Sequence, residues 1–144
     1  MHCIEYNAGY KYQLKQEYRL TIPIRPTAPI RSDFIELSAE GLLVIKKGYA
    51  WDGPSGPTID TATFMRGSLV HDALYQLMRE GRLDHDRHRG AADQLLHDIC
   101  IEDGMWPLRA WWVLKAVVWF GDPNADPAHN RPSTWAPDRC SNQK

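Results

Sequence analysis

The chain lacks the cysteine content of a disulfide-stabilised protein and the net charge of a nucleic-acid-binding one. Its three cysteines, Cys3, Cys100 and Cys140, are odd in number and have no metal-type spacing. They argue against a disulfide framework, and we expect three free thiols in a reducing compartment. The formal net charge is -1, whereas binding to phosphate backbones needs a concentrated positive face. We therefore expect no nucleic acid among the partners.

The chain also lacks a long uninterrupted apolar run. Its most apolar stretch, Met105 to Phe120, is short and contains Arg109 and Lys115, so we expect no transmembrane segment. The first residues, Met1 to Tyr6, have neither the basic nor the apolar region of a signal peptide. These absences predict a cytoplasmic protein.

The composition that remains is that of one folded domain. A length of 144 residues, 43% of them hydrophobic and 24% charged, suits a single domain with a substantial core. We expect this domain to span residues 1–122, with residues 1–50 β-rich and residues 58–121 helical. Residues 123–144 combine four prolines with Asn, Asp and Ser, which predicts an extended or partly disordered C-terminal tail.

Short β-type segments in the first 50 residues predict a small antiparallel sheet. The segments are Tyr10–Leu14, Tyr18–Ile24, Phe34–Leu37 and Leu42–Ile45. The last two are joined by a turn in which Gly41 is the expected residue of positive φ. The prolines of residues 25–32 indicate a connection, and the Gly- and Pro-rich residues 47–60 predict an irregular loop.

Three helices are predicted after this loop, so we assign the fold class α+β. The expected architecture is a small N-terminal antiparallel sheet followed by a three-helix bundle with a central antiparallel helix pair. The expected helices run from Asp60 or Thr61 to about Arg79 with Gly81 ending it, from about Arg87 to Glu102 with Gly104 closing it, and from about Pro107 to Phe120.

Three adjacent polar groups interrupt the apolar pattern of the first helix: His71, Asp72 and Tyr75. His71 and Tyr75 are four residues apart and share a helix face, with Asp72 turned about 100° away. The short connection to the second helix predicts antiparallel packing, which brings Asp93 to the height of His71. An imidazole that donates one nitrogen to a carboxylate becomes a general base at the other. We therefore expect a hydrogen bond between His71 and Asp93.

Asp72 is expected to point toward the Gly- and Pro-rich loop rather than toward Asp93. Backbone carbonyls of a loop beside a carboxylate suit a hard cation, of the calcium type more than the magnesium type. A base, an orienting carboxylate and a cation together indicate metal-assisted hydrolysis, in which the base deprotonates a water and the cation stabilises the oxyanion.

Each of these residues also has a structural interpretation. His71 can be a buried histidine bonded to a carbonyl, Asp72 an exposed helix residue, Tyr75 a core residue, and Asp93 a partner of Arg89 four residues earlier. The tryptophans of the third helix indicate packing, although a surplus of them would make an apolar surface for a lipid or a protein. Only the coincidence of all the polar elements favours a functional site.

Three segments resemble a phage and bacterial family known as domain of unknown function 1353. They are Tyr49–Pro57, Leu69–Tyr75 and Arg89–Asp93, which are similar to the family's D-G-x-S-x-P loop, H-D-x-x-Y helix and R-x-x-A-D helix. The resemblance covers roughly residues 40 to 120. It implies a phage or prophage origin, hence the cytoplasm of a host cell, and no assigned activity. A non-enzymatic alternative follows, in which the chain is a phage structural or host-interaction module with a phage or host protein as its partner.

A more distant resemblance is to phospholipase A2, in which a Gly-rich calcium loop precedes an H-D-x-x-Y helix and an antiparallel helix supplies an aspartate. It implies His71 as the base, Asp93 as the residue that orients it, and Tyr75 as a hydrogen-bond partner of Asp93. The implied cofactor is Ca²⁺ and the implied substrate is a lipid or another ester. The implied calcium ligands are Asp72 and the carbonyls near Trp51, Gly53 and Gly56.

The sequence departs from the phospholipase pattern in two ways. No cysteines flank His71 and Asp72, and the loop contains Asp52, Pro54 and Pro57. A third pattern, that of the HD phosphohydrolases, requires a histidine upstream of the His-Asp pair. The only upstream histidine is His2, far outside the expected site, which disfavours this pattern.

Overall fold

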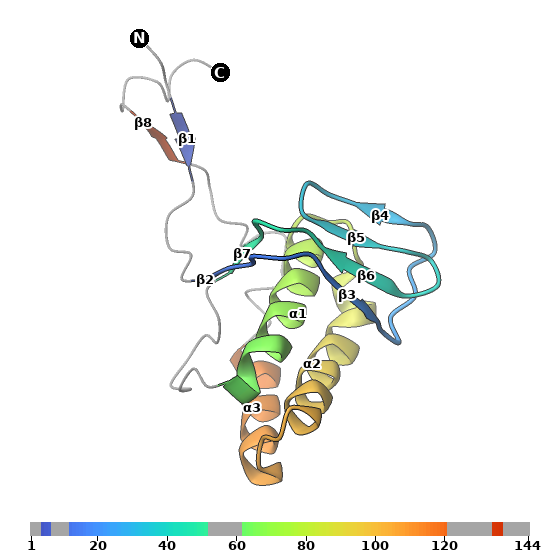
Figure 1. Cartoon of the computed structure of the whole chain (residues 1–144). Helices are drawn as coiled ribbons and strands as arrows, with labels where there is room; N and C mark the ends of the chain where they lie inside the picture. Colours follow the sequence, from blue (N-terminus) through green and yellow to red (C-terminus); the bar gives the residue numbers. More distant parts are fainter. Residues whose placement is uncertain (1–3, 7–11, 52–61, 121–133, 137–144) are drawn as a thin grey trace.

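The computed structural model describes residues 4–6, 12–51, 62–120 and 134–136. Small antiparallel sheets precede three helices (Figure 1), which confirms the α+β class. The strands are β1 (Ile4–Tyr6), β2 (Tyr12–Gln13), β3 (Tyr18–Thr21), β4 (Ile30–Arg31), β5 (Ile35–Leu37), β6 (Leu42–Ile45), β7 (Ala50–Trp51) and β8 (Thr134–Ala136), and the helices are α1 (Ala62–Arg79), α2 (His85–Glu102) and α3 (Pro107–Phe120).

The largest sheet has the strand order β3-β6-β5-β4 and is antiparallel throughout. Its central hairpin pairs Leu37 with Leu43 and Ile35 with Ile45. Gly41 stands at the turn with φ 95°, as predicted. A Cβ atom there would lie 2.4 Å from the carbonyl oxygen of Ile22, so any other residue would clash with the backbone that follows β3.

Two strands correct the predicted connections. Residues 25–32 contain β4, which pairs with β5, because Pro26 and Pro29 precede the strand and remove no hydrogen-bond donor from it. The expected irregular loop, residues 47–60, contains β7 after a turn at residues 47 and 48, and β7 pairs with β2 through Tyr12 and Trp51. This pairing continues in the hydrogen bond from the Leu14 amide to the Tyr49 carbonyl.

The tail also contains a strand that its composition did not indicate. In β8 Ala136 pairs with Ile4 and Thr134 pairs with Tyr6, so β8 and β1 form an antiparallel pair from the two ends of the chain. More than 120 residues separate the partners in sequence, and no local pattern predicts such a pairing. Residues 134–136 of the predicted tail are therefore extended, and the other residues of 123–144 lie outside the described residues.

The helices follow the predicted bounds closely, except that α2 starts two residues before Arg87. The side chain of Asp84 accepts a hydrogen bond from the Arg87 amide and caps the helix. Helix α1 packs on α2 at Gly67, where a Cβ atom would lie 2.9 Å from Leu96 and 3.0 Å from the sulfur of Cys100. The missing side chain lets the two helices approach closely.

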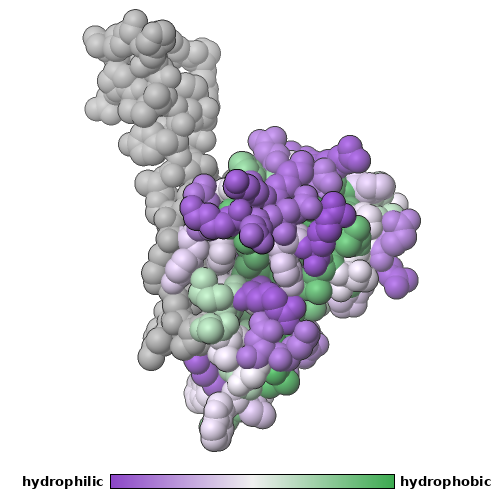
Figure 2. Space-filling view, viewed as in Figure 1, coloured by the Kyte–Doolittle hydropathy of each residue, from purple (hydrophilic) through white to green (hydrophobic). Residues whose placement is uncertain are grey.

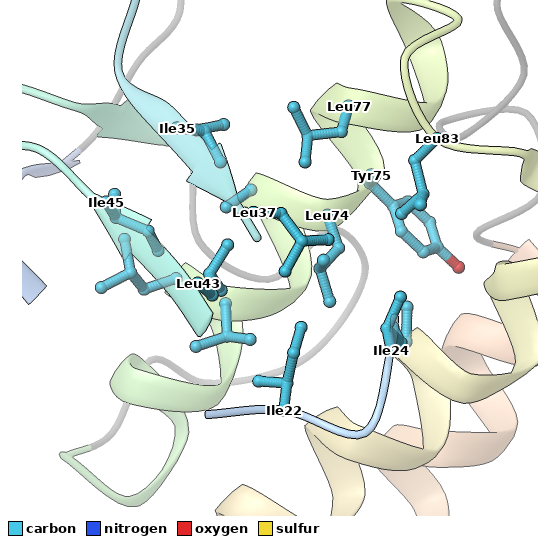
Figure 3. Close-up of a cluster of buried hydrophobic side chains, with 14 of the residues drawn as sticks. Ile22, Ile24, Ile35, Leu37, Leu43, Ile45, Leu74, Tyr75, Leu77 and Leu83 are labelled. Carbon is cyan, nitrogen blue, oxygen red and sulfur yellow. The ribbon is translucent and has the colours of Figure 1, made fainter. Parts of the chain in front are cut away.

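The main hydrophobic core lies between the four-stranded sheet and α1 (Figure 3). Its fully buried members include Ile35, Leu37, Leu43 and Ile45 from the sheet and Leu74 and Leu77 from α1. A second cluster joins α1, α2 and α3 through Phe64, Leu96, Cys100, Ala110 and Val113. On the face shown in Figure 2, hydrophilic residues gather over the sheet.

Cys100 is a buried free thiol in the second cluster, as predicted. Burial raises the pKa of this thiol to about 11, so it stays protonated at neutral pH. Cys3 and Cys140 lie outside the described residues. Within the described part of the chain, no helix is long and apolar enough to cross a membrane.

Candidate functional site

His71 and Asp93 meet between α1 and α2, which lie side by side in Figure 1. His71 Nε2 is 2.8 Å from Asp93 Oδ1, so the predicted hydrogen bond is present. Both residues are buried, with His71 7% exposed and Asp93 1% exposed. A carboxylate can only accept, so the hydrogen bond requires a proton on Nε2.

Tyr75 completes this buried group from the next turn of α1. Its hydroxyl donates to Asp93 Oδ1 over 2.5 Å, and its ring centroid lies 4.0 Å from that of His71. Figure 3 shows the hydroxyl oxygen turned away from the aliphatic core around Leu74. The predicted contact between Tyr75 and Asp93 is therefore present, and one carboxylate oxygen accepts from both neighbours.

Asp72 lies on the other side of the imidazole. Its Oδ1 is 3.9 Å from His71 Nδ1, beyond direct hydrogen-bond distance, and its side chain is 28% exposed. The two nitrogens of His71 therefore face two carboxylates in different ways. Nε2 is bonded to a fully buried carboxylate, and Nδ1 faces a partly exposed one.

Arg89 is a further member of the site, one that sequence reasoning treated only as a structural alternative. Its Nε is 3.9 Å from Asp93 Oδ2, one helical turn away on α2. Its Nη2 donates to the carbonyl of Val118 on α3. The guanidinium thus places positive charge beside the second oxygen of Asp93 and ties the site to α3. The i,i+4 spacing of arginine and aspartate is the sequence feature that indicates this contact.

Trp51 approaches α1 through its side chain. The indole Nε1 donates to Ser68 Oγ over 3.2 Å, and Ser68 in turn donates to the Met65 carbonyl over 2.9 Å. Trp51 is buried and stacks on Tyr49 with ring centroids 6.3 Å apart. This contact fixes the start of the Gly- and Pro-rich loop one turn before His71. Sequence reasoning missed Ser68, because no local pattern connects it to Trp51.

The expected calcium ligands are only partly within the described residues. Gly53 and Gly56 lie outside them, and so does the loop over residues 52–61. Asp72 is a described carboxylate with partial exposure, which suits a hard cation. In the described part of the chain, no group of three or more His, Cys, Asp or Glu side chains could hold a metal ion.

Burial and the two neighbouring carboxylates shift the pKa of His71 in opposite directions. Burial lowers the pKa of its imidazole, but the contacts with Asp72 and Asp93 raise it, and the net pKa lies above the ordinary value of 6.5. Burial also raises the pKa of Tyr75, as does its hydrogen bond to Asp93, so its hydroxyl stays protonated as a donor.

This raised pKa predicts how stability depends on pH. The charged imidazolium stabilises the fold fully below the unfolded pKa of about 6.5, and this contribution is lost as pH rises through the higher folded pKa. We expect the difference in unfolding free energy between the parent and His71→Gln to shrink as the pH rises above the pKa of the unfolded histidine. Urea denaturation in EDTA across this range measures it. A difference that grows with pH would contradict the raised pKa.

Comparisons with protein-family models, curated proteins and solved structures found no match to this chain. The resemblances to the phage family and to phospholipase A2 therefore stay predictions that rest on the motifs quoted above. A functional proposal for the chain therefore rests on the geometry of His71, Asp93, Tyr75 and Asp72.

Proposed function

We propose that the chain is an ester hydrolase in which His71 is the general base and Asp93 positions it. The observation that supports this proposal is the asymmetric environment of the imidazole. Asp93 accepts from Nε2 over 2.8 Å, whereas Asp72 Oδ1 stands 3.9 Å from Nδ1. A histidine held in this way keeps Nδ1 as the basic nitrogen when it is neutral, and partly exposed Asp72 marks the side from which water reaches it.

The proposed reaction is a direct attack by water on the ester carbonyl. His71 Nδ1 takes a proton from the water as its oxygen bonds to the carbonyl carbon. The ester carbon–oxygen bond then breaks, and the proton on Nδ1 passes to the leaving alkoxide. The products are a carboxylic acid and an alcohol, and the imidazole returns to its neutral form. Asp93 stabilises the imidazolium that forms between these two steps.

The substrate class follows from the resemblance to phospholipase A2, which favours a phospholipid ester. In that resemblance Asp72 would help to hold Ca²⁺, which would supply positive charge for the oxyanion. Tyr75 holds Asp93 through its hydroxyl, and Arg89 balances the charge of the second carboxylate oxygen. Tyr75 and Arg89 are thus positioning residues, which act through Asp93.

A second candidate is favoured by the burial of the same residues. Tyr75 and Asp93 are each 1% exposed, and Tyr75 belongs to the main core. In a phage structural or host-interaction module, the polar network would cross-link α1 and α2 and would perform no reaction. Buried polar networks of this kind can specify a unique packing arrangement.

Ester cleavage by the purified chain tests the proposal. Release of product from a soluble aryl ester and from phospholipid vesicles is measured in EDTA and in calcium. The parent is expected to cleave at least one ester. Because Asp72 raises the pKa of His71, the cleavage rate of Asp72→Asn is expected to increase at a lower pH than that of the parent. The substitution also removes a carboxylate, so any requirement for calcium moves to higher concentration.

Asp86→Asn is the matched control, because Asp86 is an exposed aspartate in the first turn of α2. It should leave both the rate and its pH dependence unchanged. Absence of cleavage above the buffer rate for every ester, with and without calcium, would eliminate the hydrolase and leave the structural candidate.

A further inference from the structure

Helix α3 is apolar on two opposite faces. One face packs Ala110 and Val113 into the second core cluster, with Val117 against its edge. The other face is exposed and forms a continuous stripe at spacings of three and four residues. We call it the tryptophan stripe, and its members are Leu108, Trp111, Trp112, Lys115, Val118 and Trp119. Trp106 immediately precedes the helix and is exposed as well.

The stripe and its surroundings hold most of the tryptophans of the chain, in exposed positions where they do not contribute to the core. Four of the six tryptophans of the chain lie between residues 106 and 119, and they are between 45% and 81% exposed. The core side of α3 already uses its small residues Ala110 and Val113. A helix that is apolar on every side is normally buried or in contact with lipid. The exposed tryptophans therefore indicate an external contact surface.

The charge of this segment favours a lipid surface over a protein. Residues 105–120 contain Arg109 and Lys115 and no aspartate or glutamate. Lys115 lies within the stripe, with its Nζ 5.6 Å from the ring centroid of Trp111. Lysine is depleted from the cores of protein interfaces. At a bilayer surface the same side chain reaches the phosphate groups while its methylene stem and the indoles contact the acyl boundary.

We propose that α3 docks on the surface of an anionic phospholipid bilayer through the tryptophan stripe. The helix would lie in the plane of the interface, because its 14 residues span about 21 Å, less than the hydrocarbon core of about 30 Å. Indoles prefer the headgroup region, and Lys115 complements its negative charge. This inference rests on α3 alone and does not require that the chain hydrolyse an ester.

Binding to vesicles of ether-linked phospholipids tests the docking separately from hydrolysis, because ether lipids contain no ester to cleave. Vesicles of phosphatidylcholine are compared with vesicles that also contain phosphatidylglycerol, by co-sedimentation and tryptophan emission. The parent should bind the anionic vesicles, and its emission should shift to shorter wavelength. The double variant Trp112→Ala/Trp119→Ala should bind at least about tenfold more weakly.

Two single variants separate charge from apolar contact. Lys115→Glu should weaken binding to anionic vesicles by about tenfold or more and change binding to neutral vesicles little. Phe34→Ala removes an exposed aromatic residue from the connection between β4 and β5 and should bind as the parent does. All substituted positions are partly or fully exposed, and unchanged circular dichroism and urea midpoints verify that each variant is folded.

Three results would overturn the docking. The first is a parent protein that stays in the supernatant when anionic vesicles are sedimented. The second is a double variant that binds as tightly as the parent. The third is a parent that forms a dimer, lost in the double variant, without vesicle binding, which would make the stripe a contact between two copies of the chain.

Discussion

Replacing Asp93 with alanine is expected to lower the free energy of unfolding by about 3–5 kcal/mol. The carboxylate accepts from His71 and Tyr75, and Arg89 stands 3.9 Å from its second oxygen. Alanine would leave the Nε2–H of His71 and the hydroxyl of Tyr75 buried without this acceptor, and each unsatisfied group adds a desolvation cost. Since a domain has a total stability of about 5–15 kcal/mol, the variant should lose a large part of it. Chemical denaturation at neutral pH measures the loss.

Two variants sharpen this measurement. Asp98→Ala on the exposed side of the same helix should change the unfolding free energy by about 0.5 kcal/mol or less. Asp93→Asn keeps one oxygen acceptor at the same position, so its loss should fall between those of the two alanine variants. Equal small losses for Asp93→Ala and Asp98→Ala would show that the network does not hold α1 and α2 together.

Replacing His71 with glutamine is expected to lower the rate of ester cleavage by about 10²- to 10⁴-fold, the contribution of a general base. Glutamine is close in length to histidine and can still donate to Asp93, but it has no basic nitrogen at the position of Nδ1. Because His71 is buried, some stability will be lost as well. The rate is therefore compared at a temperature at which circular dichroism shows both proteins folded.

His97→Gln provides the matched control for this experiment. His97 lies on α2 and contacts Asp98, which makes it a second histidine–aspartate pair at the surface. Its replacement should leave the rate unchanged. A His71→Gln variant that cleaves the ester as fast as the parent would remove His71 as the base and would place any activity elsewhere in the chain.

Sequence periodicity predicted the helical half of the fold well. Apolar spacing and the punctuation by Gly81, Gly104 and Pro107 fixed three helices to within about two residues at their ends. Helical geometry then brought His71 and Asp93 together, because two antiparallel helices joined by a short turn have a defined relative height. Local rules are sufficient for such contacts.

Contacts between segments far apart in the sequence could not be predicted from local patterns. The strand pair of β1 and β8, the pairing of β7 with β2, and the hydrogen bond from Trp51 to Ser68 all depend on tertiary packing. Short strands of two or three residues have too few positions to show alternation. Arg89 was visible only as an i,i+4 partner of Asp93, and its contact with Val118 depends on how α3 packs.

In the proposed mechanism, Asp93 holds His71 with its proton on Nε2 and leaves Nδ1 as the base. Nitrogen-15 NMR of the parent labelled at histidine measures this directly, with the His71→Gln spectrum identifying the signals. At a pH above the raised pKa of His71, we expect a protonated Nε2 and an unprotonated Nδ1. The opposite tautomer, with the proton on Nδ1 facing Asp72, would contradict it.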